Sequence, residues 1–393
     1  MTTPTNRPLR IAVVAGETSG DRLGAGLLQA LAAKNPTLQV EGIGGPRMSA
    51  AGCRTLYPLE RLSVMGLFEV LGRYPEILRL RARLARRLIA DRPDVFIGID
   101  APDFNLPLAG RLHQASIPTV HYVSPQVWAW RSYRIRGIAR AVDRMLTLFP
   151  FEAAFYERYQ VPVRFVGHPF ADQIPDHVDR QAARNALGLA TEGELVALLP
   201  GSRMQEVRRL AESMILTARW LVVRRPGLRF VVAVADSSTK GPVTAALKRD
   251  GQGLPVTLWE GDARTAMTAA NVVLVASGTA TLEALLLKRP MVITYRTGAL
   301  TYRLVKAMVT VSHVGLPNLL AGRSLVPELL QDEATPEKLG QAVLEMLQRP
   351  NWQAQLQKEF QRIHETLRKD ADGSAATAVL ELVQERSAHR VAS

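Results

Sequence analysis

The sequence predicts an α/β protein with two Rossmann-like domains, each a doubly wound parallel sheet, facing a cleft. Short runs of β-branched and other apolar residues alternate with helical stretches of about 10–15 residues, a pattern typical of parallel sheets. This alternation occurs twice, and a break rich in Pro and Asp at 167–180 separates the two halves. We therefore expect one sheet before the break and one after it.

The order of the elements follows from the apolar runs, such as RIAVVA at 10–15 and DVFIGI at 94–99. In the first half we expect strands at 10–15, 40–43, 94–99, 118–123, 144–149 and 162–166, and helices at 20–34, 75–91, 104–115, 131–141 and 151–159. In the second half we expect strands at 194–199, 228–235, 255–259, 271–276 and 290–294, with helices between them. The tail from Thr335 predicts helices alone. The chain thus divides into domains at 1–170 and 171–345, with helices at 346–393 that we expect to return to the first domain.

The composition argues against a membrane-spanning, a secreted or a disulfide-stabilised protein. No apolar stretch reaches the roughly 18 residues of a membrane span, and the polar Met1–Arg10 lacks the apolar core of a signal peptide. The single cysteine, Cys53, excludes an internal disulfide framework, agrees with a reducing cytoplasm and is expected to be buried. No residue pattern specifies an oligomeric state.

The net charge of +13 indicates acidic partners, and arginine is concentrated between Arg73 and Arg92. No known nucleic-acid-binding motif accompanies these arginines, so we expect no nucleic acid. An apolar segment at 62–72 adjoins them, and an apolar wedge beside a cationic helix is typical of interfacial membrane binding. An ordinary core helix beside a solvated one is the alternative. The acceptor or membrane contacts that we predict are Val64, Met65, Leu67, Phe68, Leu71, Arg79, Arg83 and Arg87.

Asp100 stands at the carboxyl end of the run at 94–99, where ligands bind in open α/β sheets. It is our candidate for a general base. The alternative is that Asp100 merely caps the helix expected to begin near Asp103.

The loop GETSGD at 16–21 follows the first strand and opens a helix. Its glycines allow a close backbone approach to a ligand. It is neither G-x-G-x-x-G nor a P-loop, and an ordinary tight turn is the alternative. Glu17 would repel a phosphate, so we expect it to contact a sugar hydroxyl or an amide.

Two loops of the second half predict a diphosphate site. Gly201, Ser202 and Arg203 follow one strand, and a guanidinium with backbone amides can hold a diphosphate. Ser277, Gly278 and Thr279 follow another strand, and Glu283 lies one turn into the next helix. The arrangement resembles that of families that bind UDP-sugars between two Rossmann domains, in which the backbone holds the diphosphate and the Glu accepts hydrogen bonds from the ribose hydroxyls. The alternatives are a plain connector and an exposed helical glutamate.

Three further segments are ambiguous. SPQVWAWR at 124–131 suits a substrate loop or core aromatics, and His168 suits a hinge or a substrate contact. Asn318 and Arg323 stand in a segment that we expect to be an irregular loop, a setting that favours function. The seven histidines are scattered and Asp100 and Asp103 do not form Asp-x-Asp, so we expect neither a metal nor a cofactor.

Together these segments resemble the lipid-A-disaccharide synthases of Gram-negative bacteria. The resemblance runs from about residue 10 to 386 and rests on VAGETSGD (14–21), GGPRM (44–48), VMGLFEVLGR (64–73), DVFIGIDAPDFN (94–105), HYVSPQVWAWR (121–131), LLPGSR (198–203), LVASGTATLE (274–283) and VGLPNLLAGR (314–323). In the last of these, the family leads us to expect Ser or Gly before Leu316.

The resemblance implies a metal-independent, inverting GT-B glycosyltransferase that joins UDP-2,3-diacylglucosamine to 2,3-diacylglucosamine 1-phosphate (lipid X). The products are a β-1,6-linked disaccharide 1-phosphate and UDP. It implies that Asp100 is the base, that Arg203, Glu283 and Asn318 are donor-side or otherwise essential, and that Glu17 belongs to the sugar loop. It also implies a cytoplasmic protein bound peripherally to the anionic inner face of the inner membrane. A UDP-N-acetylglucosamine 2-epimerase and a non-catalytic lipid- or nucleic-acid-binding protein are the alternatives.

Overall fold

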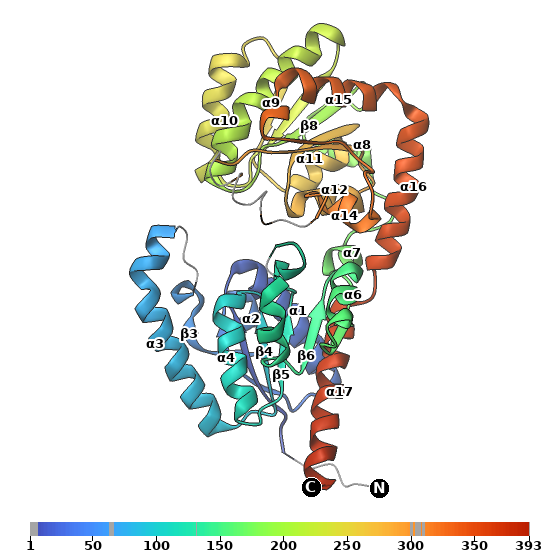
Figure 1. Cartoon of the computed structure of the whole chain (residues 1–393). Helices are drawn as coiled ribbons and strands as arrows, with labels where there is room; N and C mark the ends of the chain where they lie inside the picture. Colours follow the sequence, from blue (N-terminus) through green and yellow to red (C-terminus); the bar gives the residue numbers. More distant parts are fainter. Residues whose placement is uncertain are drawn as a thin grey trace. The chain divides into compact units, whose positions relative to one another are not determined.

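The computed structural model describes residues 7–62, 67–130, 132–298, 302, 308 and 311–392, without the side chains of 67–73, 132 and 389–392. The chain forms two compact units, and Figure 1 shows their elements. Unit 1 comprises Met1–Asp172 and Leu367–Ser393, and unit 2 comprises Gln173–Thr366. The chain therefore returns to unit 1 at Leu367, whereas the sequence-based division placed that return at about residue 346.

Unit 1 is built on a parallel sheet with the strand order β3-β2-β1-β4-β5-β6-β7. The strands are β1 (Arg10–Ala15), β2 (Gln39–Gly44), β3 (Cys53–Pro58), β4 (Val95–Ile99), β5 (Thr119–Tyr122), β6 (Arg144–Thr147) and β7 (Val163–Phe165). Helices α1 (Thr18–Lys34) and α17 (Ala371–Ala392) share a core with one face. The other face is covered by α3 (Leu67–Asp91), α4 (Pro102–Gln114), α5 (Ile135–Ala139) and α6 (Pro150–Arg158).

Unit 2 repeats this plan with a parallel sheet of order β10-β9-β8-β11-β12-β13. The strands are β8 (Leu195–Leu199), β9 (Arg229–Ala233), β10 (Val256–Trp259), β11 (Val272–Ala276), β12 (Met291–Tyr295) and β13 (Glu328–Leu330). Helices α9 (Met204–Arg224), α10 (Ser237–Asp250) and α15 (Pro336–Gln348) share the core of one face. The unit also contains α8 (Arg180–Ala186), α11 (Ala263–Ala269), α12 (Thr279–Leu286) and α14 (Leu316–Ala321), and most of α16 (Pro350–Leu367).

The prediction of two doubly wound parallel sheets is confirmed, and each predicted strand overlaps an observed one. The edge strands β3 and β13 and the short helix α2 (Pro46–Ala50) were not predicted. The helix expected at 75–91 begins earlier, at Leu67, and the one expected at 131–141 is limited to α5. Within the described ranges, no helix combines the length and the apolar composition that a membrane span needs.

Cys53 lies buried in β3, as predicted. Burial, together with the nearby charges of Asp21 and Glu41, raises the pKa of its thiol to about 12. The thiol is therefore protonated at neutral pH and packs as a small apolar side chain.

Asp21, in the first turn of α1, ties the loop after β1 to the segment after β2. Its carboxylate is 2% exposed and accepts hydrogen bonds from the backbone N–H groups of Gly45 (2.7 Å), Met48 (3.0 Å) and Arg47 (3.1 Å). These donors form the amino-terminal turn of α2, where a negative charge is favourable. A Cβ at Gly45 would lie 2.6 Å from an Asp21 carboxylate oxygen, so this position requires glycine.

Replacing Asp21 with alanine should destabilise unit 1 by about 2–4 kcal/mol, because buried N–H groups lose a charged acceptor. Urea-induced unfolding measures this change. The matched control is Glu60→Ala, which removes an exposed carboxylate from the same unit and should cost less than about 0.5 kcal/mol. Equal losses in the two variants would contradict the anchoring role of Asp21.

Candidate functional site

The winding of the unit 1 sheet reverses between β1 and its neighbour β4, so the loops that follow these two strands diverge there. Such a reversal point is where open α/β sheets bind ligands. The loop at 16–21 follows β1, and Asp100 follows β4. The loops touch: a Cβ at Gly16 would lie only 2.2 Å from the Cβ of Ala101. The Ser19 hydroxyl donates to Oδ2 of Asp100 over 3.5 Å, so the structure brings the two predicted segments together.

Asp100 and Ala101 both adopt left-handed backbone conformations, with φ of 53° and 41°. Two consecutive non-glycine residues in this region carry strain, and such strain clusters at functional sites. The N-cap of α4 is Ala101, with no side-chain capping bond, so the alternative role of Asp100 as a helix cap is not observed. The Asp100 carboxylate, partly exposed, is therefore left to face the loop at 16–21.

Asn105 holds this strained turn in place and was missed by the sequence analysis. Its side chain is fully buried, and Nδ2 donates to the carbonyl oxygens of Asp100 (2.8 Å), Val14 (3.2 Å) and Ile99 (3.3 Å). One amide group thus joins the ends of β1 and β4 to the residue that we predicted as a base. The sequence contains one hint, since Asn105 is an amide between the apolar Phe104 and Leu106.

Glu17 is the N-cap of α1, and its exposed side chain makes no capping bond. Helix α1 begins at Thr18, so neither Thr18 nor Ser19 occupies the N-cap position. Glu17 therefore lies at the same reversal point as Asp100 and remains open to solvent.

Trp128, in the aromatic segment at 124–131, and His168 both pack against phenylalanine rings. The Trp128 ring meets Phe151 edge-to-face with 4.8 Å between centroids, and Trp128 also bonds to the buried Glu152. Burial raises the pKa of Glu152 to about 8, while hydrogen bonds from the Phe149 and Leu148 backbone and from Trp128 act to lower it. His168 is buried, and its ring lies near two phenylalanine rings, at 5.5 Å from that of Phe149 and 5.0 Å from that of Phe170.

The unit 2 sheet reverses between β8 and its neighbour β11, and both predicted donor loops follow these strands. Gly201 has a φ of 118°, and Arg203 is the N-cap of α9. The Arg203 side chain is 82% exposed and lies 3.5 Å from Glu206. Ser202 is exposed as well. The guanidinium is therefore free to reorient toward a ligand at this edge.

The second donor loop places Gly278 at the N-cap of α12, with Gly278 and Thr279 exposed. Ser277 donates its hydroxyl to the Val314 carbonyl over 3.3 Å. Glu283, one turn later, is not an exposed helical glutamate, because Oε1 accepts a hydrogen bond from Nε of Arg264 at 2.6 Å. Arg264, on α11, was not predicted, and it fixes the direction of the Glu283 carboxylate.

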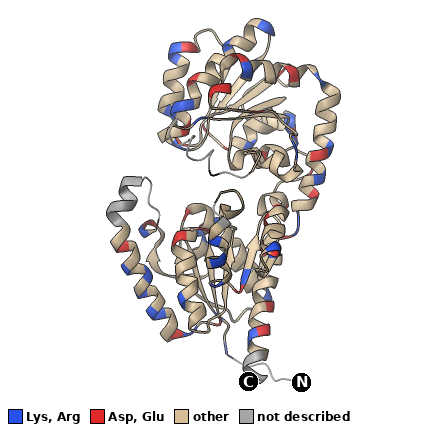
Figure 2. Ribbon diagram, viewed as in Figure 1, with Lys and Arg blue, Asp and Glu red and all other residues tan. Residues whose placement is uncertain are grey.

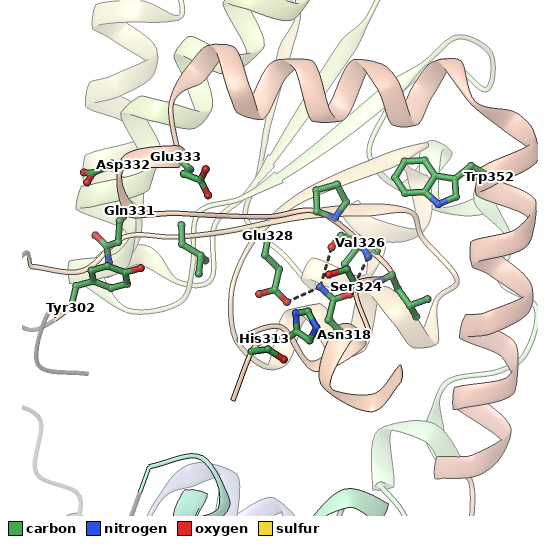
Figure 3. Close-up of a pocket in the computed structure, with 14 residues that line it drawn as sticks. Tyr302, His313, Asn318, Ser324, Val326, Glu328, Gln331, Asp332, Glu333 and Trp352 are labelled. Atoms are coloured by element: carbon green, nitrogen blue, oxygen red, sulfur yellow. Dashed lines mark hydrogen bonds between the residues drawn. The ribbon is translucent and has the colours of Figure 1, made fainter. Parts of the chain in front are cut away.

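Asn318 lies inside the short helix α14 and is 1% exposed, so the expectation of an irregular loop was wrong. Its Oδ1 accepts from the N–H groups of Leu325 (2.7 Å) and Val326 (3.0 Å). Its Nδ2 donates to the Val326 carbonyl (2.9 Å) and to Oε1 of Glu328 (2.7 Å). Figure 3 shows these bonds. Every hydrogen-bonding position of the amide is thus used within unit 2.

Glu328 in turn caps the start of α14, accepting the N–H groups of Val314 and Gly315 at 3.0 Å each. Asn318 and Glu328 line a cavity of about 650 Å³, together with His313, Asp332 and Trp352 (Figure 3). Of the predicted site residues that the structure describes, Asn318 alone lines this cavity. Arg323 is exposed and pairs with Glu359 over 3.3 Å.

The arginine-rich helix α3 is amphipathic. Leu80, Leu84 and Leu88 are buried against the sheet, while Arg79 and Arg83 are exposed. Figure 2 shows the basic residues along this helix. Among the described residues, Arg79 and Arg83 have no hydrogen-bonding or ion-pair partner, whereas Arg87 pairs with Glu41 (3.5 Å) and Asp91 (3.3 Å). The predicted apolar contacts Val64, Met65, Leu67, Phe68 and Leu71 lie outside the described backbone or side chains.

No group of three or more His, Cys, Asp or Glu side chains in the described part of the chain is arranged to hold a metal ion.

Comparison with known proteins gives concordant results. The family model described as lipid-A-disaccharide synthetase matches residues 11–381. A lipid-A-disaccharide synthase of Pseudomonas aeruginosa (strain UCBPP-PA14) is 55% identical over 96% of this chain and 99% of its own length. The synthase of Hahella chejuensis is 50% identical over 98% and 97%.

Solved structures show the same fold at low identity. The UDP-GlcNAc 2-epimerase of Neisseria meningitidis bound to UDP-GlcNAc has a TM-score of 0.63 at 12% identity, covering 96% of this chain and all of the epimerase. The glycosyltransferase of kitacinnamycin has a TM-score of 0.62 at 18% identity, covering 96% and 99%. With the two doubly wound sheets, these likenesses establish a fold of the GT-B class.

The Asn318 network generates a stability prediction. Asn318→Asp would place a second carboxylate 2.7 Å from Glu328, and Asn318→Ala would leave buried N–H groups without an acceptor. Both variants should lose about 2–4 kcal/mol of stability, with a lower thermal midpoint measured by circular dichroism. In the double variant Asn318→Asp/Glu328→Gln the repulsion is removed, so part of the loss should be recovered. Wild-type midpoints in both single variants would contradict this structural role.

Proposed function

The chain belongs to the lipid-A-disaccharide synthase family, a family of hexosyltransferases in lipid A biosynthesis. We propose that it transfers the sugar of UDP-2,3-diacylglucosamine to 2,3-diacylglucosamine 1-phosphate (lipid X). The products are a β-1,6-linked disaccharide 1-phosphate and UDP. The observation that supports this proposal most directly is the Asp100 turn, which joins the ends of β1 and β4 through Asn105.

In the proposed mechanism Asp100 accepts the proton of the acceptor 6-hydroxyl. The hydroxyl oxygen forms a bond to the anomeric carbon of the donor, and the bond from that carbon to the diphosphate oxygen breaks as UDP leaves. A single displacement of this kind inverts the anomeric configuration. Positive charge develops on the sugar as in glycoside hydrolysis, and the base supplies the usual advantage of general-base catalysis. Glu17, exposed beside Asp100, is proposed to bind a hydroxyl of the acceptor sugar.

The leaving diphosphate requires positive charge and hydrogen-bond donors, and the proposed mechanism takes these from the protein without a metal. The exposed guanidinium of Arg203 and the backbone groups of Gly201 and Ser202 suit one side of the diphosphate. The backbone N–H groups of the exposed residues Gly278 and Thr279, with the Ser277 hydroxyl, suit the other. Glu283 uses one carboxylate oxygen for Arg264 and keeps the second for the ribose hydroxyls.

Asn318 is proposed to act by positioning rather than by touching substrate. It bonds to Glu328, which holds the backbone of Val314 and Gly315, and Val314 accepts the hydroxyl of Ser277. The network therefore connects a buried amide to the loop assigned to the diphosphate.

The acylated, anionic substrates require a contact with the lipid surface, which we assign to the segment before and along α3. Arg79 and Arg83, which are exposed and have no partner among the described residues, suit the anionic inner face of the inner membrane. Val64, Met65, Leu67, Phe68 and Leu71 are proposed to insert beside them. Arg87, already paired, is proposed to contribute less.

Asp100→Asn should lower kcat by about 10²–10⁴-fold, because the base is lost while the shape is kept. The measurement is release of UDP from UDP-diacylglucosamine with and without lipid X. Asp103→Asn is the matched control: it removes an exposed carboxylate at the same helix start, paired only with Arg134 at 2.7 Å within the described structure. It should keep nearly full turnover.

Two results of this assay would contradict the proposal. Turnover of Asp100→Asn close to that of the parent would rule out Asp100 as the base. UDP release that is independent of lipid X would instead favour the reaction of a 2-epimerase or a hydrolase.

Replacing Arg79 and Arg83 with glutamine should weaken sedimentation with phosphatidylglycerol vesicles by roughly 30-fold, at about 1 kcal/mol for each cation near the surface. High salt should weaken the binding of the parent protein as well. The matched control replaces Arg224 and Arg349, two exposed arginines of unit 2, with glutamine. Equal losses in both double variants would indicate nonspecific attraction rather than a contact through α3.

A further inference from the structure

Three arginines converge at the edge of the unit 2 sheet opposite the proposed donor loops. Arg180 and Arg184 are four residues apart on α8 and so lie on the same side of this helix. Arg184 donates to the Ala269 carbonyl (3.1 Å) and to Oδ1 of Asn271 (3.0 Å), which attaches α8 to the start of β11. Strands β11 and β12 pair with Val273 opposite Met291, so the same register places Asn271 opposite Arg289.

Of these three side chains, Arg184 alone donates hydrogen bonds to other described residues. Besides the two bonds to the start of β11, it donates to the carbonyls of Thr191 (2.6 Å) and Gly193 (2.9 Å). Arg289 is only 6% exposed, and its Nε is buried without a partner. No hydrogen bond or ion pair connects the side chain of Arg289 or Arg180 to any residue in the described part of the chain.

No acidic residue of the neighbouring segments pairs with Arg180 or Arg289 within the described structure, and Glu192 is exposed to solvent. Glu194 pairs with Arg225 at 2.8 Å. Asp179 uses its carboxylate to cap α8, and Asp176 accepts from Gln361 at 3.1 Å and lies 3.8 Å from Lys288. The cluster therefore has positive charge without a counter-charge from these segments.

Arg289 is the arginine of this cluster whose charged form is most strongly disfavoured. Burial, followed by the charges of Arg180 and Arg184, lowers the pKa of Arg289 to about 10. The guanidinium is still charged at neutral pH, and a buried charge of this kind is normally compensated by an opposite charge with hydrogen bonds. A bound anion would supply both.

We propose that Arg289 and Arg180 form a binding site for a phosphate or phosphoryl group, held by the two unpaired guanidinium groups and structurally supported by Arg184. A phosphoryl group suits them because its several oxygens can each accept from planar N–H donors, and its double charge matches two cations. The site lies at the amino ends of β11 and β12, whereas the proposed donor loops follow the carboxyl ends of β8 and β11. It is therefore separate from the proposed function and does not rest on it.

Thermal unfolding of the full chain with increasing inorganic phosphate, at constant ionic strength and with saturating UDP, tests this proposal. UDP is included to occupy the donor loops. A ligand of the folded state at about 100 times its Kd should raise the midpoint by roughly 5 °C. Arg180→Gln and Arg289→Met should lose this rise, and Arg158→Gln, which changes an exposed arginine of unit 1, should keep it.

Arg289→Met should also be at least as stable as the parent protein without phosphate, because the uncompensated charge is gone. If this buried change prevents folding, the half-buried Arg180→Gln carries the test. An absent phosphate response in the parent, or an undiminished response in Arg180→Gln, would overturn the proposal.

A second arm distinguishes the source of the phosphoryl group once the phosphate response is found. Sedimentation with phosphatidylglycerol vesicles is compared between the parent protein, Arg180→Gln and Arg158→Gln. A selective loss of vesicle binding in Arg180→Gln would support a phospholipid headgroup as the ligand. Unchanged vesicle binding with a lost phosphate response would support a soluble phosphate compound.

Discussion

Each sheet winds in opposite directions from a central pair of neighbouring strands, and this reversal decides where the candidate residues lie. Crossovers between parallel strands are right-handed, so the connections that leave β1 and β4 must pass to opposite faces of the sheet. The same holds for β8 and β11 in unit 2. The loops that follow these strands therefore diverge at the carboxyl ends, which is where open α/β sheets bind ligands. Asp100 directly follows β4, and Arg203 lies in the loop after β8.

The reversal point in unit 1 depends on close backbone packing between the loops after β1 and β4. Gly16 lets the loop after β1 contact Ala101, where any larger side chain would collide. Asp100, Ala101 and Val123 all have positive φ at the ends of β4 and β5. Each such residue costs of order 1–3 kcal/mol, and the buried amide of Asn105 helps to maintain the strained turn. The strain is concentrated at the edge that carries the proposed base.

Buried polar groups divide unit 2 into two regions of different character. Around Asn318 every donor and acceptor of the amide is matched, which makes that region a rigid support for the adjoining loops that we propose to bind the donor. Around Arg289 the positive charge is left without a partner in the described structure. Folding alone explains the first arrangement, while the second is understandable if a ligand completes it.

Much of the fold could be predicted from the sequence because hydrophobic runs are a local property. The runs at 94–99 and 271–276 are buried on both faces and are followed directly by the polar residues that we selected, Asp100 and Ser277. The strands β3 and β13 escaped prediction because most of their residues are only partly buried or exposed, and neither CRTLYP nor ELL forms a continuous apolar run.

The partners of the candidate residues could not be read from the sequence. Arg264 meets Glu283, and Asn318 meets Glu328, only after helices and strands have packed. The sequence by itself determined the two α/β halves, the loops at the strand ends and the residue types that bear the chemistry. The tertiary structure alone decided that hydrogen bonds occupy the whole Asn318 amide, that Asn105 supports the Asp100 turn and that Arg289 is buried with no counter-charge among the described residues. Hydrophobic periodicity operates between near neighbours in the chain, whereas the satisfaction of a buried polar group depends on residues that folding brings together.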